Sequence, residues 1–282
     1  MEGEGIPGLG LLRRLRRVLE TRVFLAKEFD PAWTVCIFGS RRSGTTWLLD
    51  LVSNVPGYIP IYEPFNPRWY PESQPFHPHP NPKQPTIEEY VSKVVKGTLE
   101  VEVPLYDFNL RNLWRRLRGS RLVVKCVRAN LLVPLFAEAG VRLCIYLIRN
   151  PFAVVSSQLR TGIMPHLAHL HREPKLPLES LLTLLWVGEQ RVPLAYSHPR
   201  LLKLRYEDVV EEPEAALEEV ARRLEVDPSV FFGGDWSKPS RSTRGGIERA
   251  RNRWRRELTP EQKRNISEAL ERTGFDYEAL TL

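Results

Sequence analysis

Cysteine is scarce in this chain of 282 residues, and a long uninterrupted apolar run is missing from it. The three cysteines, Cys36, Cys126 and Cys144, each lie inside an apolar, strand-like run. We therefore expect buried, reduced thiols, and neither a disulfide framework nor a cysteine metal site. Because no apolar stretch is long enough to cross a bilayer, we expect no transmembrane segment. Both features are typical of a cytoplasmic protein.

The first residues lack the pattern of a secretory signal peptide. Glu2 and Glu4 precede the stretch "LGLLRRLRRVLE", which is basic and amphipathic. This pattern predicts an N-terminal helical extension over residues 1–32. Such a helix packs on its domain or, as the alternative, contacts a membrane surface.

Signals of nucleic-acid binding are also missing, although the net charge is +7. No basic stripe with interleaved aromatic residues, zinc-ligand spacing or helix-turn-helix pattern is present, so we expect no nucleic-acid partner. The positive charge comes mainly from arginine, which far outnumbers lysine. Because arginine forms bidentate pairs with phosphate and sulfate, the composition indicates a smaller anionic ligand.

Strands and helices alternate along the sequence. Apolar or β-branched runs predict four buried parallel strands, at 33–39, 121–127, 141–148 and 200–206. Capping residues, N-terminal prolines or terminal glycines mark amphipathic helices at 86–97, 150–162, 213–226 and 259–274. The pattern predicts an α/β fold of three layers, with a central parallel sheet between helices. Without an internal repeat or a linker, we expect a single domain over residues 1–282, and a homo-oligomer is possible.

The stretch "IFGSRRSGTTWLLDL", residues 37–51, lacks one residue of a familiar motif. Gly39 and Gly44 have the spacing of the phosphate loop G-x-x-x-x-G-K-[ST], but Thr45 stands where the lysine would be. Backbone N–H groups and the positive end of the following helix still favour an anion. No obvious metal-holding aspartate follows a later strand. The loop therefore suits a shorter anion than a magnesium-bound triphosphate.

Four motifs, in order along the chain, resemble those of sulfotransferases that use 3′-phosphoadenosine 5′-phosphosulfate (PAPS). "RRSGTTWL" resembles the 5′-phosphosulfate loop, and "YLIRNPFAVVSSQLR" resembles the 3′-phosphate motif. "LRYEDVVEEPEAAL" and "RSTRGGIERARNRW" resemble the later Y-E-D and nucleotide-clamp segments. The resemblance implies a P-loop-kinase-like sulfotransferase fold, similar to carbohydrate-type members. The nucleotide-binding residues it implies are Arg42, Ser43, Gly44, Thr45, Thr46, Trp47, Arg149, Ser157, Tyr206, Arg244, Gly245 and Gly246.

For some of these residues a structural role is the alternative. Trp47 stacks on adenine in this comparison but would equally serve as a core aromatic. Trp254 would pack its own segment. Glu207 and Asp208 are expected mainly to cap a helix N-terminus.

The implied reaction transfers a sulfuryl group from PAPS to an acceptor hydroxyl or amine and releases adenosine 3′,5′-bisphosphate. The implied catalytic residues are Arg42, Glu63 and Lys125. Arg42 stabilises the leaving oxygen as a fixed cation, because arginine keeps its proton. Glu63, in "IPIYEPFNP", is similar to the E-P segment of carbohydrate-type members and is expected to be the general base. Lys125 or Arg128 would steady the transferred group or an acidic acceptor.

Two irregular stretches, 64–85 and 162–178, are expected to form the acceptor side. Trp69, Tyr70 and Phe76 in the first suit a small-molecule or glycan acceptor. The spacing of His77, His79, His166, His169 and His171 suggests a metal, but no ligand set is complete, so we expect none. One of these histidines is the alternative base. The alternative functions are a P-loop kinase of a small metabolite and a non-catalytic adenosine-bisphosphate-binding protein.

Overall fold

Five parallel strands form the centre of the molecule. The computed structural model describes residues 27–66, 86–99, 118–162, 176–232, 252–280 and 282. Within these ranges the sheet order is β2-β3-β1-β4-β5. The strands are β1 (Thr34–Phe38), β2 (Tyr58–Tyr62), β3 (Arg121–Lys125), β4 (Leu143–Ile148) and β5 (Leu201–Arg205). All neighbouring pairs are parallel, which confirms the predicted sheet.

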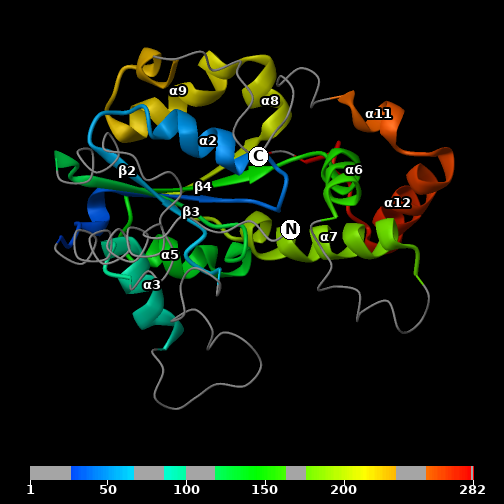
Figure 1. Ribbon diagram of the computed structural model, residues 1–282, viewed down its shortest axis with the longest axis horizontal. Helices are drawn as coiled ribbons and strands as arrows, with labels where there is room; N and C mark the ends of the chain where they lie inside the picture. Colours follow the sequence, from blue (N-terminus) through cyan, green and yellow to red (C-terminus); the bar gives the residue numbers. More distant parts are fainter. Residues whose placement is uncertain (1–26, 67–85, 100–117, 163–175, 233–251, 281) are drawn as a thin grey trace, which may run out of the picture.

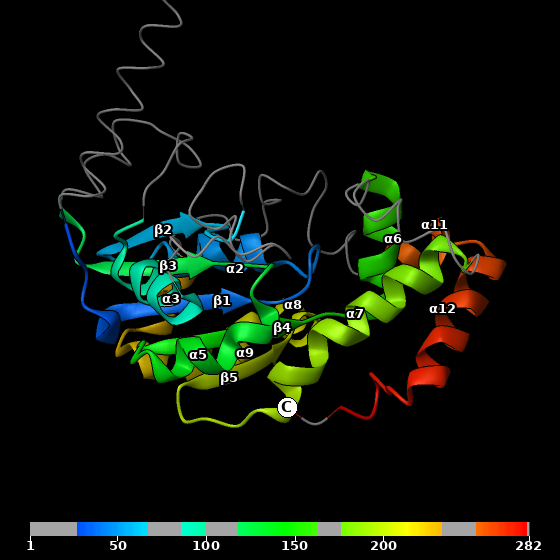
Figure 2. The ribbon, with the colours of Figure 1, turned by 90° about the horizontal axis from the view of Figure 1, so that it is seen from below.

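Helices cover both faces of this sheet, as Figure 1 shows. On one side lie α2 (Thr45–Val52), α8 (Tyr206–Glu211) and α9 (Pro213–Leu224), and on the other α3 (Ile87–Lys96), α5 (Val133–Glu138) and α7 (Leu178–Ala195). Beyond the carboxyl ends of the strands, α6 (Pro151–Thr161), α11 (Trp254–Glu257) and α12 (Pro260–Thr273) gather beside one end of α7 (Figure 2). Short 3₁₀ turns are η1 (Pro31–Trp33), η3 (Asn130–Leu132) and η6 (Pro228–Phe232).

The central strand shows how the layers hold together. Val35 and Ile37 pack toward α2 and α9, whereas Cys36 and Phe38 pack toward α3 and α5. Successive side chains of a strand point to opposite faces, so one apolar strand contributes to both layers of the core. Cys36, Cys126 and Cys144 are free and buried, as predicted.

Local capping signals confirm the predicted helix boundaries. The Thr86 hydroxyl accepts from the Glu89 N–H, the Glu89 carboxylate accepts from the Thr86 N–H, and Gly97 ends α3 in the left-handed conformation. At the start of α6, Asn150 Oδ1 accepts from the N–H groups of Phe152 and Ala153. Such caps satisfy N–H groups that the helix itself leaves unpaired.

All four predicted strands are present, and the structure adds a fifth, β2, which the sequence analysis did not predict. β2 contains Pro60 and pairs only with β3, so it forms an edge of the sheet. A proline cannot donate to a strand ladder and is tolerated at an edge. The sequence pattern of β2 therefore differs from that of the buried strands, although it delivers Glu63 to the site.

Candidate functional site

The predicted site residues gather at the carboxyl edge of the sheet. Every strand ends there in a residue or loop named above: Glu63 follows β2, Lys125 ends β3, the loop 39–44 follows β1, Arg149 follows β4, and Tyr206 follows β5. After β1 the chain fills one side of the sheet with β2 and β3, and then crosses to β4 and β5. Open α/β sheets bind ligands at such a reversal, here between β1 and β4.

The loop between β1 and α2 forms an anion-binding turn. Gly39 and Gly44 have φ values of 145° and 92°, and the Ser43 N–H donates to the Ser40 carbonyl at 3.0 Å. Gly44 precedes α2 without a side-chain cap, so the first N–H groups of that helix remain available to a ligand. The buried Ser43 Oγ has no hydrogen-bond partner among the described residues. This donor set fits a phosphate or a sulfate.

Two candidate catalytic residues have unusual backbone conformations. Arg42 has a φ of 75° and Glu63 a φ of 51°. In the described ranges Glu225, which ends α9, is the third non-glycine residue with a positive φ. Such conformations cost on the order of 1–3 kcal/mol and concentrate at functional sites. Neither conformation could be predicted from the sequence.

Gly44 also allows a close approach between the loop and Tyr206. A Cβ atom at residue 44 would lie 2.4 Å from the Tyr206 ring, at a φ that residues with side chains rarely adopt.

Gly44→Ala should therefore lower the free energy of unfolding by roughly 2–4 kcal/mol, measured by urea denaturation. Gly188→Ala is the control. That position is open, so alanine should stabilise α7 by about 0.5–1 kcal/mol. Wild-type stability of Gly44→Ala would contradict the tight packing.

Arg42, Arg149, Ser157 and Tyr206 form one cluster. The Arg149 Nη1 donates to the Arg42 carbonyl at 3.0 Å, and its guanidinium lies 4.1 Å from the centre of the Tyr206 ring. The Arg42 Nε donates to the Ser157 Oγ at 2.9 Å. Burial, followed by the charges of Arg160 and Arg149, lowers the pKa of Arg42. Such a gathering of cations is the electrostatic requirement for a doubly anionic ligand.

The aromatic residues beside this cluster have packing roles. Trp47 is 5% exposed and makes an edge contact with Tyr206 in the core. Of the two roles weighed for Trp47, the structure shows core packing. Trp254 stacks on Phe152 of α6, at 4.9 Å between the ring centres, which agrees with the predicted packing role.

Glu63, after β2, and Lys125, at the end of β3, form a buried ion pair. The Lys125 Nζ donates to Glu63 Oε1, and the Val127 N–H donates to Oε2 at 3.2 Å. Burial lowers the pKa of Lys125, but the charges of Glu63 and Tyr62 and the hydrogen bond to Glu63 together outweigh it, so this pKa is raised. Lys125 therefore stays charged. Arg128, by contrast, is exposed.

Buried side-chain amides, which were not predicted from the sequence, form hydrogen bonds with the loop 39–44. The Gly39 N–H donates to Asn130 Oδ1 at 2.9 Å, and Gln190 Nε2 donates to Ser40 Oγ at 2.8 Å. Gln158 Nε2 donates to the Arg41 carbonyl at 3.1 Å. These buried amides lie on helical turns far from the loop in sequence. Single amides within apolar helices give no pattern that would have identified them.

Glu189, on α7, is a titratable residue that interacts with Ser40 and Arg41 of the same loop. Burial raises its pKa to about 7, although the Ser40 hydroxyl and the charge of Arg41 act to lower it. Between pH 4.5, the ordinary value, and about 7 the folded protein keeps a proton that the unfolded chain releases. Stability should therefore fall as the pH rises through this window, by at most about 3 kcal/mol.

Glu189→Gln should remove that loss and flatten the dependence of the unfolding free energy on pH. Urea unfolding at pH 5 and pH 8 measures it. Glu268→Gln, which replaces an exposed carboxylate on α12, is the matched control and should leave the slope unchanged. An unaltered slope in Glu189→Gln would contradict this role of Glu189.

Glu207 lies in the first turn of α8 and also supports a second helix start. Its carboxylate accepts from the Asn150 N–H at 3.1 Å and from the Tyr277 hydroxyl. Glu207, which follows β5, therefore supports the start of α6, which follows the neighbouring strand β4.

Arg244, Gly245 and Gly246 lie outside the described residues. So do the five histidines of the irregular stretches and Trp69, Tyr70 and Phe76.

In the part of the chain that the structure describes, no group of three or more His, Cys, Asp or Glu side chains could hold a metal ion. None of the helices in this part of the chain combines the length and the apolar character needed to cross a membrane.

Comparisons with known proteins agree with this architecture. A family model described as "Sulfotransferase domain" matches residues 34–241, more than half of the chain. A search of curated proteins gives no match. The sulfotransferase domain of the Synechococcus PCC 7002 olefin synthase is similar in structure, with a TM-score of 0.50 and 20% identity over 89% of this chain and 96% of that one. This likeness shows the fold.

Two further solved structures have lower TM-scores. The sulfotransferase domain of the curacin biosynthetic pathway has a TM-score of 0.49 and 18% identity, over 86% of this chain and 97% of that one. Mouse sulfotransferase SULT7A1, complexed with PAP, has a TM-score of 0.48 and 15% identity, over 93% and 91% respectively.

Proposed function

This chain belongs to the sulfotransferase domain family, and from that premise we propose that it transfers a sulfuryl group from PAPS to a hydroxyl or amine acceptor. The products are the sulfated acceptor and adenosine 3′,5′-bisphosphate. The acceptor is a small molecule or a glycan. A cytoplasmic location, a single domain and a homo-oligomer remain predictions from the sequence.

One observation carries the proposal: arginines from two strand ends lie in a single cluster. Arg149 donates to the carbonyl of Arg42, whose side chain donates to Ser157. The unpartnered Ser43 hydroxyl and the uncapped start of α2 lie on the same loop as Arg42. Two phosphate positions on one adenosine require cations so arranged. The residues therefore fit adenosine bisphosphate.

The nucleotide side is assigned as follows. Ser43, Thr45, Thr46 and the first N–H groups of α2 hold the 5′-phosphosulfate, and Arg42 supplies a fixed positive charge beside it. Arg149 and Ser157 hold the 3′-phosphate. PAPS supplies an activated sulfuryl group on a phosphate leaving group. Because Arg42 cannot give up its proton, it stabilises charge there without acting as an acid.

The acceptor side is assigned to the ends of β2 and β3. Glu63 accepts the proton of the acceptor hydroxyl or amine. Its two hydrogen-bond donors, Lys125 and the Val127 N–H, fix the carboxylate. Each carboxylate oxygen has two lone pairs, so capacity for the acceptor proton remains.

Turnover of PAPS with a panel of sugars, phenols, amines and lipids tests the proposal. We expect one acceptor class to gain the mass of one sulfuryl group, with release of adenosine 3′,5′-bisphosphate and with a metal chelator present. Phosphate transfer from magnesium-ATP, without sulfuryl transfer to any acceptor, would contradict it.

A further inference from the structure

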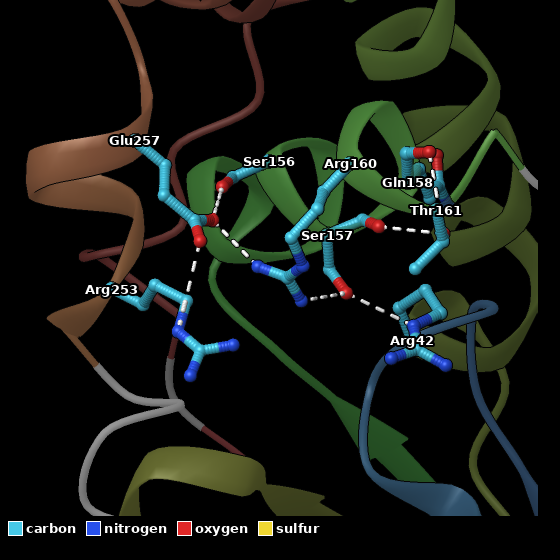
Figure 3. Close-up of polar contacts among 8 residues, drawn as sticks. All are labelled: Arg42, Ser156, Ser157, Gln158, Arg160, Thr161, Arg253 and Glu257. Carbon is cyan, nitrogen blue, oxygen red and sulfur yellow. Dashed lines mark hydrogen bonds and ion pairs between the residues drawn. The ribbon is translucent and has the colours of Figure 1, made fainter. Parts of the chain in front are cut away.

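A second cation reaches the Ser157 hydroxyl from its own helix. Figure 3 shows Ser157 between Arg42 of the loop and Arg160 of α6. Arg42 Nε donates to Ser157 Oγ at 2.9 Å, and Arg160 Nη2 donates to the same oxygen at 3.2 Å. A hydroxyl oxygen has two acceptor sites, so both are occupied by donors from guanidinium groups.

The Ser157 proton must therefore point elsewhere. Within the described ranges, Ser157 Oγ has these two donors and no recorded acceptor for its own proton. Hydrogen bonds from charged donors polarise a hydroxyl and strengthen it as a donor. The arrangement orients Ser157 to donate to an anion that lies near both arginines.

Arg160 is itself held on its far side. Its Nη1 donates to Glu257 Oε2 at 2.6 Å, and the Ser156 hydroxyl donates to the same carboxylate oxygen at 2.8 Å (Figure 3). Arg253 Nε lies 3.7 Å from Glu257 Oε1. Glu257 thus fixes one edge of the Arg160 guanidinium while the other edge faces Ser157.

Arg160 has N–H donors left for a ligand. A guanidinium has five N–H donors, and the contacts with Glu257 and Ser157 use two of them. The side chain is 37% exposed, so a bound anion could be reached without moving the ion pair. Arg160 and Arg149 both lower the pKa of Arg42, which places each of these two charges within electrostatic reach of Arg42.

We propose that Arg160 is a further nucleotide-binding residue, which contacts the 3′-phosphate together with Ser157, and that Glu257 is a positioning residue that orients its guanidinium. This inference rests on the proposed function. It also connects the nucleotide site to α11. The stack of Phe152 on Trp254 holds α11 against α6 independently of Glu257, so a Glu257 variant should keep that packing.

Calorimetry with two nucleotides tests this inference. Adenosine 3′,5′-bisphosphate and adenosine 5′-monophosphate differ by the 3′-phosphate alone. Arg160→Ala should weaken binding of the bisphosphate by about 10- to 100-fold, since it removes charge-assisted hydrogen bonds. The monophosphate should change by less than about threefold, because a 3′-phosphate contact contributes nothing to its binding.

Three further variants sharpen the result. Arg160→Lys keeps the charge without the fork and should recover part of the lost affinity. Glu257→Gln should weaken bisphosphate binding by about 3- to 10-fold and leave monophosphate binding unchanged. The loss is smaller than in Arg160→Ala because the variant weakens the orientation of the Arg160 guanidinium but keeps its contact with the 3′-phosphate. Arg256→Ala, the matched control, removes a neighbouring cation of α11 and should shift both affinities by less than about threefold. Thermal melts verify folding.

The outcomes separate the two proposals. Equal losses for both nucleotides in Arg160→Ala, or no loss for either, would overturn the role of Arg160 while the proposed function stands. Equal changes for both in Glu257→Gln would overturn its positioning role. A wild-type protein that does not bind the bisphosphate would overturn the proposed function and this inference together.

Discussion

Glu63→Gln should lower kcat by about 10²- to 10⁴-fold, the usual contribution of a general base, and leave nucleotide affinity within about threefold. The amide keeps the shape of the side chain but cannot take the acceptor proton. Glu63 follows β2, which lies two strands away from β1 in the sheet, and we place the nucleotide between the ends of β1 and β4. Turnover with PAPS and calorimetry with adenosine 3′,5′-bisphosphate measure the two effects separately.

Loss of stability must be distinguished from loss of the base. Glu63→Gln leaves Lys125 buried without its counter-charge, and breaking a buried pair costs about 3–5 kcal/mol. The double variant Glu63→Gln/Lys125→Met removes both charges and should recover stability without recovering turnover. Glu28→Gln breaks the exposed pair with Lys96 and should change stability by less than about 1 kcal/mol. Wild-type turnover in folded Glu63→Gln would exclude Glu63 and redirect attention to the loop histidines.

Arg149→Met should weaken binding of adenosine 3′,5′-bisphosphate by about 10²- to 10³-fold, because two charge-assisted hydrogen bonds contribute roughly 3–5 kcal/mol. Methionine keeps the apolar stem that packs near Tyr206 but removes the guanidinium. Arg149→Lys should lose about tenfold, since a point charge cannot form the bidentate contact. Calorimetry provides both values.

Strand β4 offers a matched control for this prediction. Arg142 directly precedes β4 and Arg149 directly follows it, so the two arginines lie at opposite edges of the sheet. Arg142 donates to the Arg223 carbonyl and to Glu225, so Arg142→Met should lower stability without changing nucleotide affinity. Equal affinity losses in both variants would indicate a general charge effect and contradict a specific role for Arg149.

The fold was predictable where local signals are strong. Buried parallel strands consist of near-continuous apolar residues, and the caps of α3, α6 and α12 follow from Thr86, Asn150 and Thr259. β2 was missed because an edge strand that contains Pro60 has a less uniform apolar pattern than a buried strand. The sequence could also not show which helix Glu207 caps, since its partner Asn150 precedes a different helix.

The site was predictable to the extent that parallel strands deliver their final residues to one edge. The structure accordingly places two motif residues at strand ends, Arg149 and Tyr206, beside the loop 39–44, and their contacts with a nucleotide stay predictions. The residues that position the site residues were not predicted. Gln190 and Glu257 act across more than 90 residues of sequence on Ser40 and Arg160, and such long-range hydrogen bonds have no periodicity. Left-handed backbone at Arg42 and Glu63 depends on tertiary contacts and is equally hidden.

The central claim is that arginines from the β1 loop and from the end of β4 together bind a doubly phosphorylated adenosine without a metal. Calorimetric titration of the wild-type protein with adenosine 3′,5′-bisphosphate in the presence of a chelator tests it most directly. We expect tight, stoichiometric binding that magnesium does not strengthen, and weak binding of magnesium-ATP. Binding that requires magnesium, or a preference for magnesium-ATP, would contradict it.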